Sequence, residues 1–576
     1  MYRNEHPNPQ FERDFYVCLN GKWEFEKGRG LTNVRLAGEI EVPFCPESEL
    51  SGIGDKSFIT DCTYSRLISV SEDDLKGRLV LHFGAVDYYC EVYVNGSFVT
   101  SHTGGYTAFE ADIAPFANVG ENRITVLVHD DVRENIPSGK QSKKDFSYGC
   151  FYTRSTGIWQ TVWLERTPRK YIKSVKFQIL PDMKSVRVNV SAEGCGDVYV
   201  KVFFGGREVG AASGNIDYRR SFDIALSEVR LWEVGKGNLY DVEITFGGDR
   251  VKSYFGLRTV SYNGRKFLIN GKSVFQRLVL DQGYYEDGIY TAKHADRFKE
   301  DIRLSQSLGF NGARLHQKVF EQRYLYESDR AGYLVWGEFP NWGMKYDDLK
   351  ALGTFVSQWS EVIGQYINHP SIITWCPLNE VWEDLDNEKI IRDMRFVEAA
   401  YAVTKTMDPS RPCVDASGGY HGNHTDVFDF HNYHLSDKTY EFIEDILKHD
   451  KLSMDKTYAP AAAQENVVYD GKLPLNASEY GGVSFGKDCV RERVREGEGW
   501  GYHSFETEED FLNEYIKTTK AYLECEKLSG FCYTQLYDVE QEQNGLYLYT
   551  RKRKFSEKIL KAIAECNLLV AAIEKA

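Results

Sequence analysis

The C-terminal part of the chain alternates short apolar segments with helical ones. Eight apolar segments, most of them separated by amphipathic patterns, run through residues 261–576. Short, continuously apolar strands are typical of a buried parallel sheet, in which helices form the crossovers. Eight such strands over about 310 residues predict a closed (β/α)8 TIM barrel. The predicted strands are Val274–Leu280, Gly312–Leu315, Leu334–Gly337, Ile372–Leu378, Pro412–Asp415, Val427–Tyr433, Leu475–Glu479 and Phe531–Leu536. The predicted helices include Asp301–Leu308, Phe355–Tyr366, Ile390–Thr406, Glu509–Cys525 and Ile559–Leu569.

Residues 1–260 carry a different pattern, with short strands throughout. Residues 1–170 contain alternating or β-branched runs such as Arg78–Phe83 and Cys90–Gly96, each closed by turn residues. Residues 171–260 repeat the pattern more briefly, as in Val186–Val190. Several short strands within about 90 residues predict a small β-sandwich. At roughly 100–200 residues per domain, we expect three domains, 1–170, 171–260 and 261–576.

Two of the predicted barrel strands end in a glutamate. The strand Ile372–Leu378 runs into Asn379 and Glu380, and a later strand ends at Glu479, followed by Tyr-Gly-Gly. Barrel enzymes carry their catalytic groups at the carboxyl ends of the strands. Two glutamates on different strand ends therefore suggest cleavage of a glycosidic bond by a carboxyl pair.

The neighbours of these glutamates suggest their roles. A retaining mechanism needs two carboxyl groups about 5–5.5 Å apart, one as nucleophile and one as acid and then base. We predict that Glu380 is the general acid/base and that Glu479 is the nucleophile. Asn379 would hydrogen-bond the sugar 2-hydroxyl. Tyr433, at the end of the sixth strand, would donate to Glu479 and keep it ionised.

Composition indicates which binding partners and which cellular compartment to expect. The 576-residue chain has a formal net charge of −15 and no stripe of Lys and Arg, which argues against nucleic acid. Residues 1–7 contain no apolar secretion signal, and no apolar run reaches the roughly 20 residues of a membrane helix. The 12 cysteines are scattered without a Cys-x-x-Cys pair, which is typical of a cytoplasmic protein. Asp429, His431 and His434 are neighbours, but strand alternation separates His434 from the other two, so we predict neither a metal site nor a cofactor.

Motifs along nearly the whole chain occur together in one known family. They are Leu19–Phe25, Val92–Gly96, Ser155–Gln160, Phe255–Arg258, Phe267–Lys272, Leu308–Arg314, Leu334–Glu338 and the stretches around Glu380 and Glu479. With these motifs the chain resembles glycoside hydrolase family 2, the β-galactosidase, β-glucuronidase and β-mannosidase family. The resemblance implies an N-terminal jelly-roll β-sandwich of the sugar-binding type, an immunoglobulin-like β-sandwich and a C-terminal catalytic TIM barrel. It also implies a retaining exo-glycosidase.

Some positions depart from the family pattern. Members often carry a histidine after the first barrel strand and another beyond the second-strand arginine. This chain has Gln282 and Gln317 there, with His316 close to Arg314. The Asn-x-Lys pair with which glucuronidases hold the sugar carboxylate is replaced by residues 544–546, Asn-Gly-Leu. Because an uncompensated carboxylate is costly in a closed pocket, these residues disfavour a glucuronidase.

Other strand ends supply further sugar-binding candidates. Asp281 and Gln282 follow the first strand, Trp336 and Glu338 close the third, and Tyr533 on the eighth matches the family's aromatic floor. The predicted substrate-binding residues are Asn379, Tyr433, Arg314, His316, Asp281, Gln282, Gln317, Trp336, Glu338 and Tyr533. Trp382 is a candidate for the leaving-group side, and the loop 484–503 is either a lid or a solvated loop.

Together these features predict a metal-independent exo-β-glycosidase that acts by double displacement with two glutamates. Its substrate would be an oligosaccharide or glycoside with a terminal β-galactose. Because several pocket positions are altered, a furanosidase that releases arabinofuranose or galactofuranose is an alternative. A non-catalytic carbohydrate-binding protein is another, although binding alone needs no acid/nucleophile pair. Such enzymes often close their pockets with neighbouring subunits, so a homo-oligomer is also considered.

Overall fold

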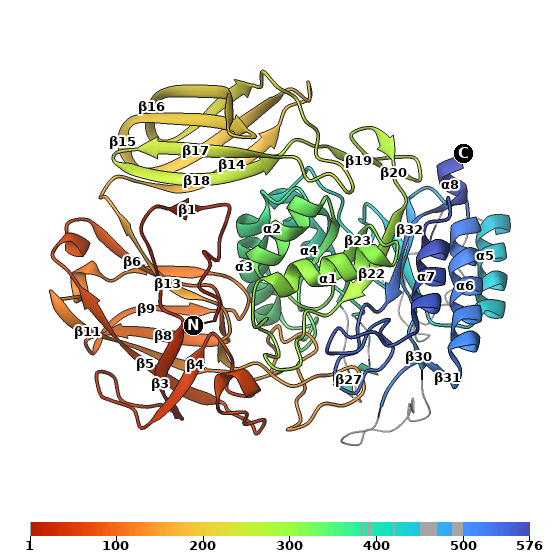
Figure 1. Cartoon of the computed structure of the whole chain (residues 1–576), viewed down its shortest axis with the longest axis horizontal. Coiled ribbons are helices and arrows are strands. Elements are labelled where there is room, and N and C mark those ends of the chain that lie inside the picture. The colour runs from red at the N-terminus through yellow and green to blue at the C-terminus, as the bar shows by residue number, and fades with distance from the viewer. Residues whose placement is uncertain are drawn as a thin grey trace.

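The computed structural model describes residues 2–381, 384–385, 388–389, 393–418, 421–449, 469, 471–485 and 499–575. It contains two β-sandwiches and an α/β barrel, packed against one another (Figure 1). No helix within these ranges is long and apolar enough to span a lipid bilayer.

The first unit is a jelly-roll sandwich of two antiparallel sheets. Its strands alternate buried and exposed side chains, so that Trp23 and Phe25 point into a core shared by both sheets. The six-stranded sheet has the order β4 (Gly38–Val42), β3 (Gly21–Lys27), β5 (Asp61–Val70), β11 (Gly120–His129), β8 (Tyr89–Val94) and β9 (Ser97–Thr103). The four-stranded sheet has the order β10 (Phe109–Asp112), β6 (Arg78–Phe83), β13 (Val162–Thr167) and β2 (Tyr16–Cys18). The small elements are β7 (Val86–Asp87), β12 (Gly157–Ile158), η1 (Glu49–Ser51), η2 (Asp73–Leu75) and η3 (Ala114–Phe116).

The second unit is the immunoglobulin-like sandwich. Alternate valines along its longest strand, such as Val186 and Val188, are fully buried in a separate apolar core. The strands are β1 (Glu12–Arg13), β18 (Asp249–Gly256), β17 (Leu239–Phe246), β15 (Ser185–Phe204) and β14 (Tyr171–Ile179), with β16 (Arg207–Ala225) paired to β15. Because β1 pairs with β18, the start of the chain contributes to this second sheet. The predicted boundary at residue 170 falls between β13 and β14.

The third unit is the TIM barrel. Its parallel strands follow the order β25 (Ile372–Cys376), β24 (Leu334–Glu338), β23 (Gly312–Leu315), β22 (Gln276–Asp281), β32 (Leu528–Thr534), β29 (Leu475–Gly481) and β28 (Phe428–Asn432). The helices are α1 (Asp296–Ser307), α2 (Gln322–Ala331), α3 (Leu349–Tyr366), α4 (Met394–Met407), α5 (Ser436–His449), α6 (Glu508–Glu524), α7 (Glu557–Asn567) and α8 (Ala572–Lys575). Shorter pieces are β19 (Val260–Asn263), β20 (Lys266–Ile269), β21 (Lys272–Ser273), β26 (Asp384–Leu385), β27 (Glu388–Lys389), β30 (Val483–Phe485) and β31 (His503–Phe505).

The predicted fifth strand, residues 412–415, is not a regular strand. The segment makes only isolated parallel bridges to the fourth strand and its extension, at Cys413 and Ser417. Pro412 has no N–H to donate to a ladder. On the other edge, the Cys413 carbonyl accepts from Asp426 in the loop before β28, not from β28 itself. The fifth position of the barrel is therefore filled by an irregular segment.

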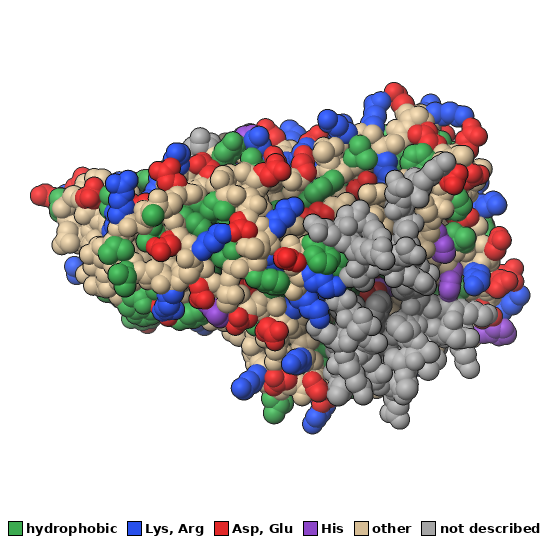
Figure 2. All heavy atoms as spheres, turned by 90° about the horizontal axis from the view of Figure 1, so that it is seen from below, with side chains coloured by type: hydrophobic (Ala, Val, Ile, Leu, Met, Phe, Trp, Pro, Cys, Tyr) green, Lys and Arg blue, Asp and Glu red, His purple; other side chains and the backbone are tan. Residues whose placement is uncertain are grey.

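The first unit and the barrel share a continuous apolar core. Trp159 and Tyr106 of the sandwich contact Tyr290 of the barrel, with ring centroids 5.1 and 6.3 Å from it. The Gln541 side chain also donates to the carbonyls of Gly149 and Phe151, at 2.7 and 3.0 Å. These bonds hold residues 130–156, the loop between β11 and β12 that we call the sandwich loop, against the barrel. On the face shown in Figure 2, basic and acidic side chains of the described residues are interspersed.

Candidate active site

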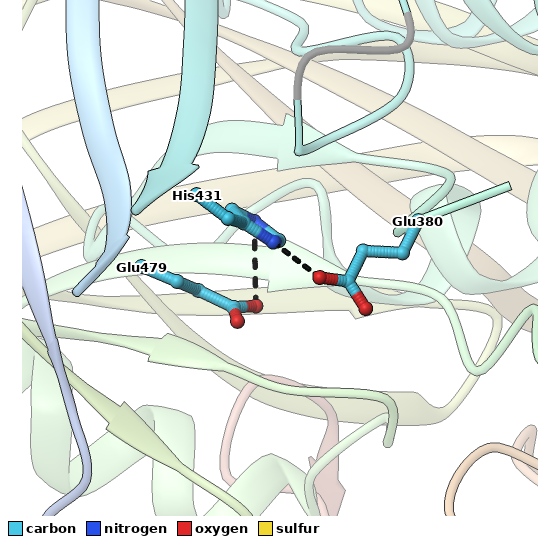
Figure 3. A group of neighbouring side chains, drawn as sticks. All are labelled: Glu380, His431 and Glu479. Atoms are coloured by element: carbon cyan, nitrogen blue, oxygen red, sulfur yellow. Dashed lines mark hydrogen bonds and ion pairs between the residues drawn. The ribbon is translucent and has the colours of Figure 1, made fainter. Parts of the chain in front are cut away.

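Glu380 and Glu479 face each other at the carboxyl end of the barrel. Glu380 follows β25, Glu479 lies in β29, and both side chains are buried. One carboxyl oxygen of each and a ring nitrogen of His431 lie within 4.8 Å of one another (Figure 3). Glu380 has a φ of +42°, which non-glycine residues rarely adopt. Backbone strain of this kind is concentrated at functional sites.

Arg314 joins three strands of the site. From the end of β23, its fully buried guanidinium donates from Nε to Glu338 Oε2 at 2.7 Å. Its Nη1 donates to Glu479 Oε1 at 2.9 Å, and its Nη2 donates to Asn379 Oδ1 at 2.6 Å. A planar guanidinium can hold several acceptors in fixed directions at once. Arg314 therefore orients the predicted nucleophile and the amide beside the predicted acid.

Glu479 is held ionised. Burial alone would raise its pKa, but the nearby His431 and Arg314 outweigh burial and lower the pKa to about 2. Tyr433 donates a hydrogen bond from its hydroxyl to Glu479 Oε2. The Tyr433 ring stacks on Tyr502, with centroids 3.5 Å apart, so this hydroxyl is well fixed.

Glu380 has the opposite proton preference. Burial raises its pKa and the charge of Glu479 adds to the rise, although His431 opposes it. His431, on β28, places Nδ1 2.5 Å from Glu380 Oε1 and Nε2 3.4 Å from Glu479 Oε1 (Figure 3). The pair thus combines a carboxyl group that favours its proton with one that has lost it. This is the division of labour that acid/base and nucleophilic roles require.

The backbone of Asn379 is hydrogen-bonded to the side chain of Asn341, which lies in the loop after the third strand. Its N–H donates to Asn341 Oδ1, and Asn341 Nδ2 donates to its carbonyl, both at 3.0 Å. Gln317 in turn donates to Asn341 Oδ1 at 2.6 Å and accepts from the N–H of Trp342. Gln317 therefore helps to hold Asn341, which in turn holds the backbone of Asn379. The Nδ2 of Asn379 has no hydrogen-bond partner among the described residues.

Glu338 and His316 lie beside Arg314. Glu338 accepts from the backbone N–H of Gln317 at 2.9 Å as well as from Arg314. His316 Nδ1 lies 3.1 Å from Glu338 Oε1 and 3.9 Å from Glu479 Oε1. Burial lowers the pKa of His316, which favours the neutral ring at pH 7.

Two predicted residues do not reach this group, because they point elsewhere on their strands. Asp281 faces the helices, where it accepts from the hydroxyls of Tyr324 and Tyr537. Tyr533 also faces outward and packs on Tyr480 and on Tyr515 of α6. Alternation along β32 instead sends Thr534 inward, where its Oγ1 lies 3.2 Å from the Tyr433 hydroxyl.

Trp336 does face the barrel interior, but it belongs to the apolar core. Its Nε1 donates to Gln276 Oε1 at 2.8 Å, and Gln276 is the first residue of β22. The ring therefore leans toward the amino ends of the strands, away from the carboxyl pair. It packs in the cluster with Phe267 and Ile269 of β20.

A polar chain joins Gln282 to the sandwich loop. Gln282 Nε2 donates to Gln535 Oε1 at 2.8 Å, and Gln535 Nε2 donates to Asn544 Oδ1 at 2.7 Å. Asn544 then donates to Glu542 Oε1 at 3.0 Å. The hydroxyl of Tyr152, from the sandwich loop, also donates to Glu542. The Oε1 of Gln282 has no partner among the described residues.

Lys140, from the same loop, brings a buried ammonium group to this side of the barrel. Its Nζ lies 3.8 Å from Glu542 Oε2, and 5.5 and 5.8 Å from the ring centroids of Tyr152 and Trp342. Burial lowers the pKa of Lys140, but Glu542 outweighs burial and the net effect is a rise, to which Glu479 contributes. Lys140 is therefore charged, and it lies close enough to Glu380 and Glu479 for their charges to raise its pKa.

Three of these groups were not among the predicted site residues. Strand alternation did put His431 on one side with Asp429, but nothing in the sequence gives its distance from Glu380. Lys140 lies in a loop far away in sequence, and no local pattern marks it. Strand alternation could have predicted that Thr534 faces inward, because Thr534 is adjacent to Tyr533. Trp382 and most of the loop 484–503 (residues 486–498) lie outside the described residues.

The atoms of Glu380, His431 and Glu479 are close enough to be considered as metal ligands. However, Arg314 Nη1 lies 2.9 Å from Glu479 Oε1 and 3.3 Å from His431 Nε2. A guanidinium at this distance already neutralises the carboxylate and would repel a second cation. The geometry therefore favours an organic acid/base site.

Comparisons with known proteins agree with this architecture. The chain matches the model "Glycosyl hydrolases family 2, sugar binding domain" over residues 17–168 and "Glycosyl hydrolases family 2, TIM barrel domain" over residues 260–483. It is 25% identical over 508 residues to the β-galactosidase of Thermoanaerobacterium thermosulfurigenes, which covers 81% of this chain and 64% of that protein. It is 26% identical over 394 residues to the β-glucuronidase of Paenibacillus borealis, covering 62% of this chain and 64% of that protein. The chain thus spans less than two thirds of the length of these relatives. A solved structure of a β-glucuronidase from an uncultured Clostridium sp. superposes with a TM-score of 0.76 at 21% identity, covering 98% of this chain and 99% of that one.

Proposed function

The chain belongs to glycosyl hydrolases family 2, and on that premise we propose that it is a retaining exo-β-glycosidase. One observation carries the proposal. An oxygen of Glu380 and an oxygen of Glu479 lie within 4.8 Å of each other, and the two groups have opposite proton preferences. Retaining glycosidases hold their carboxyl groups about 5–5.5 Å apart, whereas inverting ones need about 6.5–9.5 Å.

The reaction would proceed in two displacements. In the first, Glu479 attacks the anomeric carbon while Glu380 gives its proton to the glycosidic oxygen, and the aglycone leaves. In the second, Glu380 takes a proton from water, whose oxygen attacks the same carbon and releases Glu479. The low pKa of Glu479 supports its role as nucleophile and leaving group, and the raised pKa of Glu380 supports its role as acid.

The neighbouring residues would bind and orient the sugar. The unpartnered Nδ2 of Asn379 is available to the 2-hydroxyl, a contact that strengthens as the ring flattens toward the transition state. Arg314 and Tyr433 would fix the attacking carboxylate. The sandwich loop that carries Lys140 and Tyr152 packs on one side of the site, which supports removal of one terminal sugar.

The charges near the pair support a neutral sugar, for which we propose a terminal β-galactose. The three nitrogens of Arg314 are occupied by protein acceptors, and Lys140 is paired with Glu542. Leu546, at the position of the family's carboxylate-binding lysine, is fully buried and apolar. Within the part of the chain that the structure describes, a sugar carboxylate would approach Glu542 without a spare cation to receive it.

Hydrolysis of a panel of nitrophenyl glycosides tests the proposal. The panel contains the β-galactoside, β-glucoside, β-mannoside, β-glucuronide, fucoside, arabinofuranoside and galactofuranoside. We expect release of nitrophenol from the β-galactoside and none from the glucuronide, with Glu479→Gln as the inactive control. A furanoside hit would replace the sugar but keep the mechanism. Glucuronide hydrolysis would contradict the charge argument, and silence across the panel would contradict the proposed activity.

A further inference from the structure

The Glu380–His431 contact is buried, with 5% of Glu380 and 1% of His431 exposed. The 2.5 Å separation between Glu380 Oε1 and His431 Nδ1 is among the short hydrogen bonds of the site. Gly418, with a φ of +102°, packs directly on both residues. A Cβ at position 418 would lie 3.1 Å from Glu380 Cγ and 3.2 Å from His431 Cε1 and Nδ1. Gly418 thus packs against one side of the pair.

A network behind His431 determines which of its nitrogens carries a proton. Asp429 Oδ2 accepts hydrogen bonds from both the Ser417 and the Ser478 hydroxyls. Since Ser417 has given its only hydrogen to Asp429, its oxygen can only accept at the 3.1 Å contact with His431 Nε2. Nε2 must therefore carry a hydrogen.

The contacts of Arg314 are consistent with a hydrogen on His431 Nε2. Its Nη1 has two hydrogens, and it lies within bonding distance of two better acceptors, Glu479 Oε1 at 2.9 Å and the Ser478 carbonyl at 3.3 Å. It therefore need not donate to His431 Nε2. With Nε2 protonated, the bond between His431 Nδ1 and Glu380 contains one hydrogen, which resides on either partner.

We propose that His431 is a positioning residue that shares with Glu380 the single proton used in acid/base catalysis. The inference rests on the proposed glycosidase function, because it assigns the source of that reaction's proton. Before the first displacement the pair holds one proton between Nδ1 and Oε1. Glu380 delivers it to the glycosidic oxygen as the bond to the anomeric carbon breaks, which leaves Glu380 ionised and His431 neutral. The attacking water then returns one proton to the pair.

The shared proton has a consequence for the pH dependence. Two sites that compete for one proton hold it to a higher pH than one site alone. The charged groups that face His431 are Glu380, Glu479 and Arg314, with Asp429 behind Ser417. The two glutamates favour a proton on the ring and Arg314 opposes it. Removal of the imidazole should therefore move the alkaline limb of kcat/KM to lower pH.

The variant His431→Asn tests the proposal through its dependence on the leaving group. We expect kcat/KM to fall by about 100-fold for a phenyl glycoside, whose departure needs a proton, and less than threefold for a dinitrophenyl glycoside, which departs without one. The alkaline limb for the phenyl substrate should move down by about one pH unit. His424→Asn is the matched control, because that side chain is 68% exposed and bonds Glu398 at the surface. Equal losses for both substrates, or no loss for either, would overturn the proposal.

A second measurement does not depend on turnover. In protein labelled with 13Cε1-histidine, the signal absent from His431→Asn identifies this ring, and its titration is followed with pH. We expect a midpoint above 6.5 in the wild type and a lower one in Glu380→Gln, because the carboxylate partner is gone. An unchanged midpoint in Glu380→Gln would refute the sharing of the proton. If instead the titration behaves as expected but no glycoside is hydrolysed, the proposed function fails and the proton-sharing pair stands.

Discussion

Replacement of Tyr433 by phenylalanine removes one hydroxyl group and little else. The Tyr433 hydroxyl donates to Glu479 Oε2, and the phenyl ring can keep its stacking on Tyr502. A hydrogen bond to a charged group contributes about 1.5–3 kcal/mol. Since one pKa unit corresponds to about 1.4 kcal/mol, the pKa of Glu479 should rise from about 2 to about 3–4.

Two kinetic effects should follow in Tyr433→Phe. The acid limb of kcat/KM, which we expect near pH 2 in the wild type, should enter the accessible range between about pH 3 and 4. In the second displacement Glu479 departs as a carboxylate, and the lost hydrogen bond would have stabilised its charge. With a dinitrophenyl glycoside, for which this step limits turnover, kcat should fall by about 10- to 150-fold, the rate equivalent of 1.5–3 kcal/mol.

Initial rates between pH 3 and 8 measure both effects. Aliquots returned to pH 6 before assay separate acid inactivation from titration. Thr534→Val is the matched control, because Thr534 lies 3.2 Å from the Tyr433 hydroxyl but has no hydrogen bond to Glu479 among the described residues, and it should change kcat less than threefold. If Tyr433→Phe is folded, keeps its kcat within twofold of the wild type and shows no acid limb above pH 3, the reasoning about Glu479 is wrong.

Three further predictions follow from the same site. In Glu380→Ala, a dinitrophenyl glycoside should still form the glycosyl-enzyme, and azide should accelerate its release at least tenfold as a glycosyl azide of unchanged anomeric configuration; hydrolysis insensitive to azide would argue against Glu380 as acid/base. Arg314→Lys should lower kcat/KM more than 100-fold and reduce the free energy of unfolding by about 3–5 kcal/mol. The reason is that one ammonium group cannot hold the three acceptors of Arg314 and leaves a buried carboxylate unpaired. Denaturant unfolding that matches the wild type would contradict this prediction. Burial lowers the pKa of His421, but Asp415 and Asp429 outweigh burial and raise the pKa to about 10. The contribution of the charged His421 to stability is therefore complete below about pH 6.5 and is lost as the pH rises through 10. The difference in melting temperature between the wild type and His421→Asn should shrink from pH 7 to pH 10, and a constant difference would contradict this.

The barrel could be predicted because its information is local. Each strand is a short apolar run, and each of the two glutamates lies within or just beyond the carboxyl end of one, so that pattern and position point to the same residues. Of the eight predicted barrel strands, only the prediction of the fifth was wrong. Its apolar run begins at Pro412, and its second edge pairs with a loop instead of a strand.

The side-chain directions were harder to predict, because a strand end has two faces. Asp281 and Gln282 are adjacent, and only Gln282 points toward the polar chain that reaches the sandwich loop. Tyr533 and Thr534 differ in the same way. Choosing the face requires the register of each strand, and a shift of one residue exchanges inside for outside. Bulges within β28 and β29 add to this ambiguity.

The remaining features depend on contacts between distant segments. Lys140 and Tyr152 belong to the first sandwich, and their meeting with Glu542 depends on how that unit packs on the barrel. The place of His431 between the two glutamates depends on three strands at once. Neither arrangement leaves a pattern within a window of sequence.

Covalent trapping tests the central claim most directly. The wild type would be incubated with the 2-deoxy-2-fluoro, dinitrophenyl-activated form of the sugar identified by the glycoside panel, digested, and examined by mass spectrometry. We expect loss of activity with one fluorosugar attached to the peptide that carries Glu479, and no such label in Glu479→Gln. A label on another carboxylate, or rapid turnover of the panel substrate by inversion without any label, would contradict it.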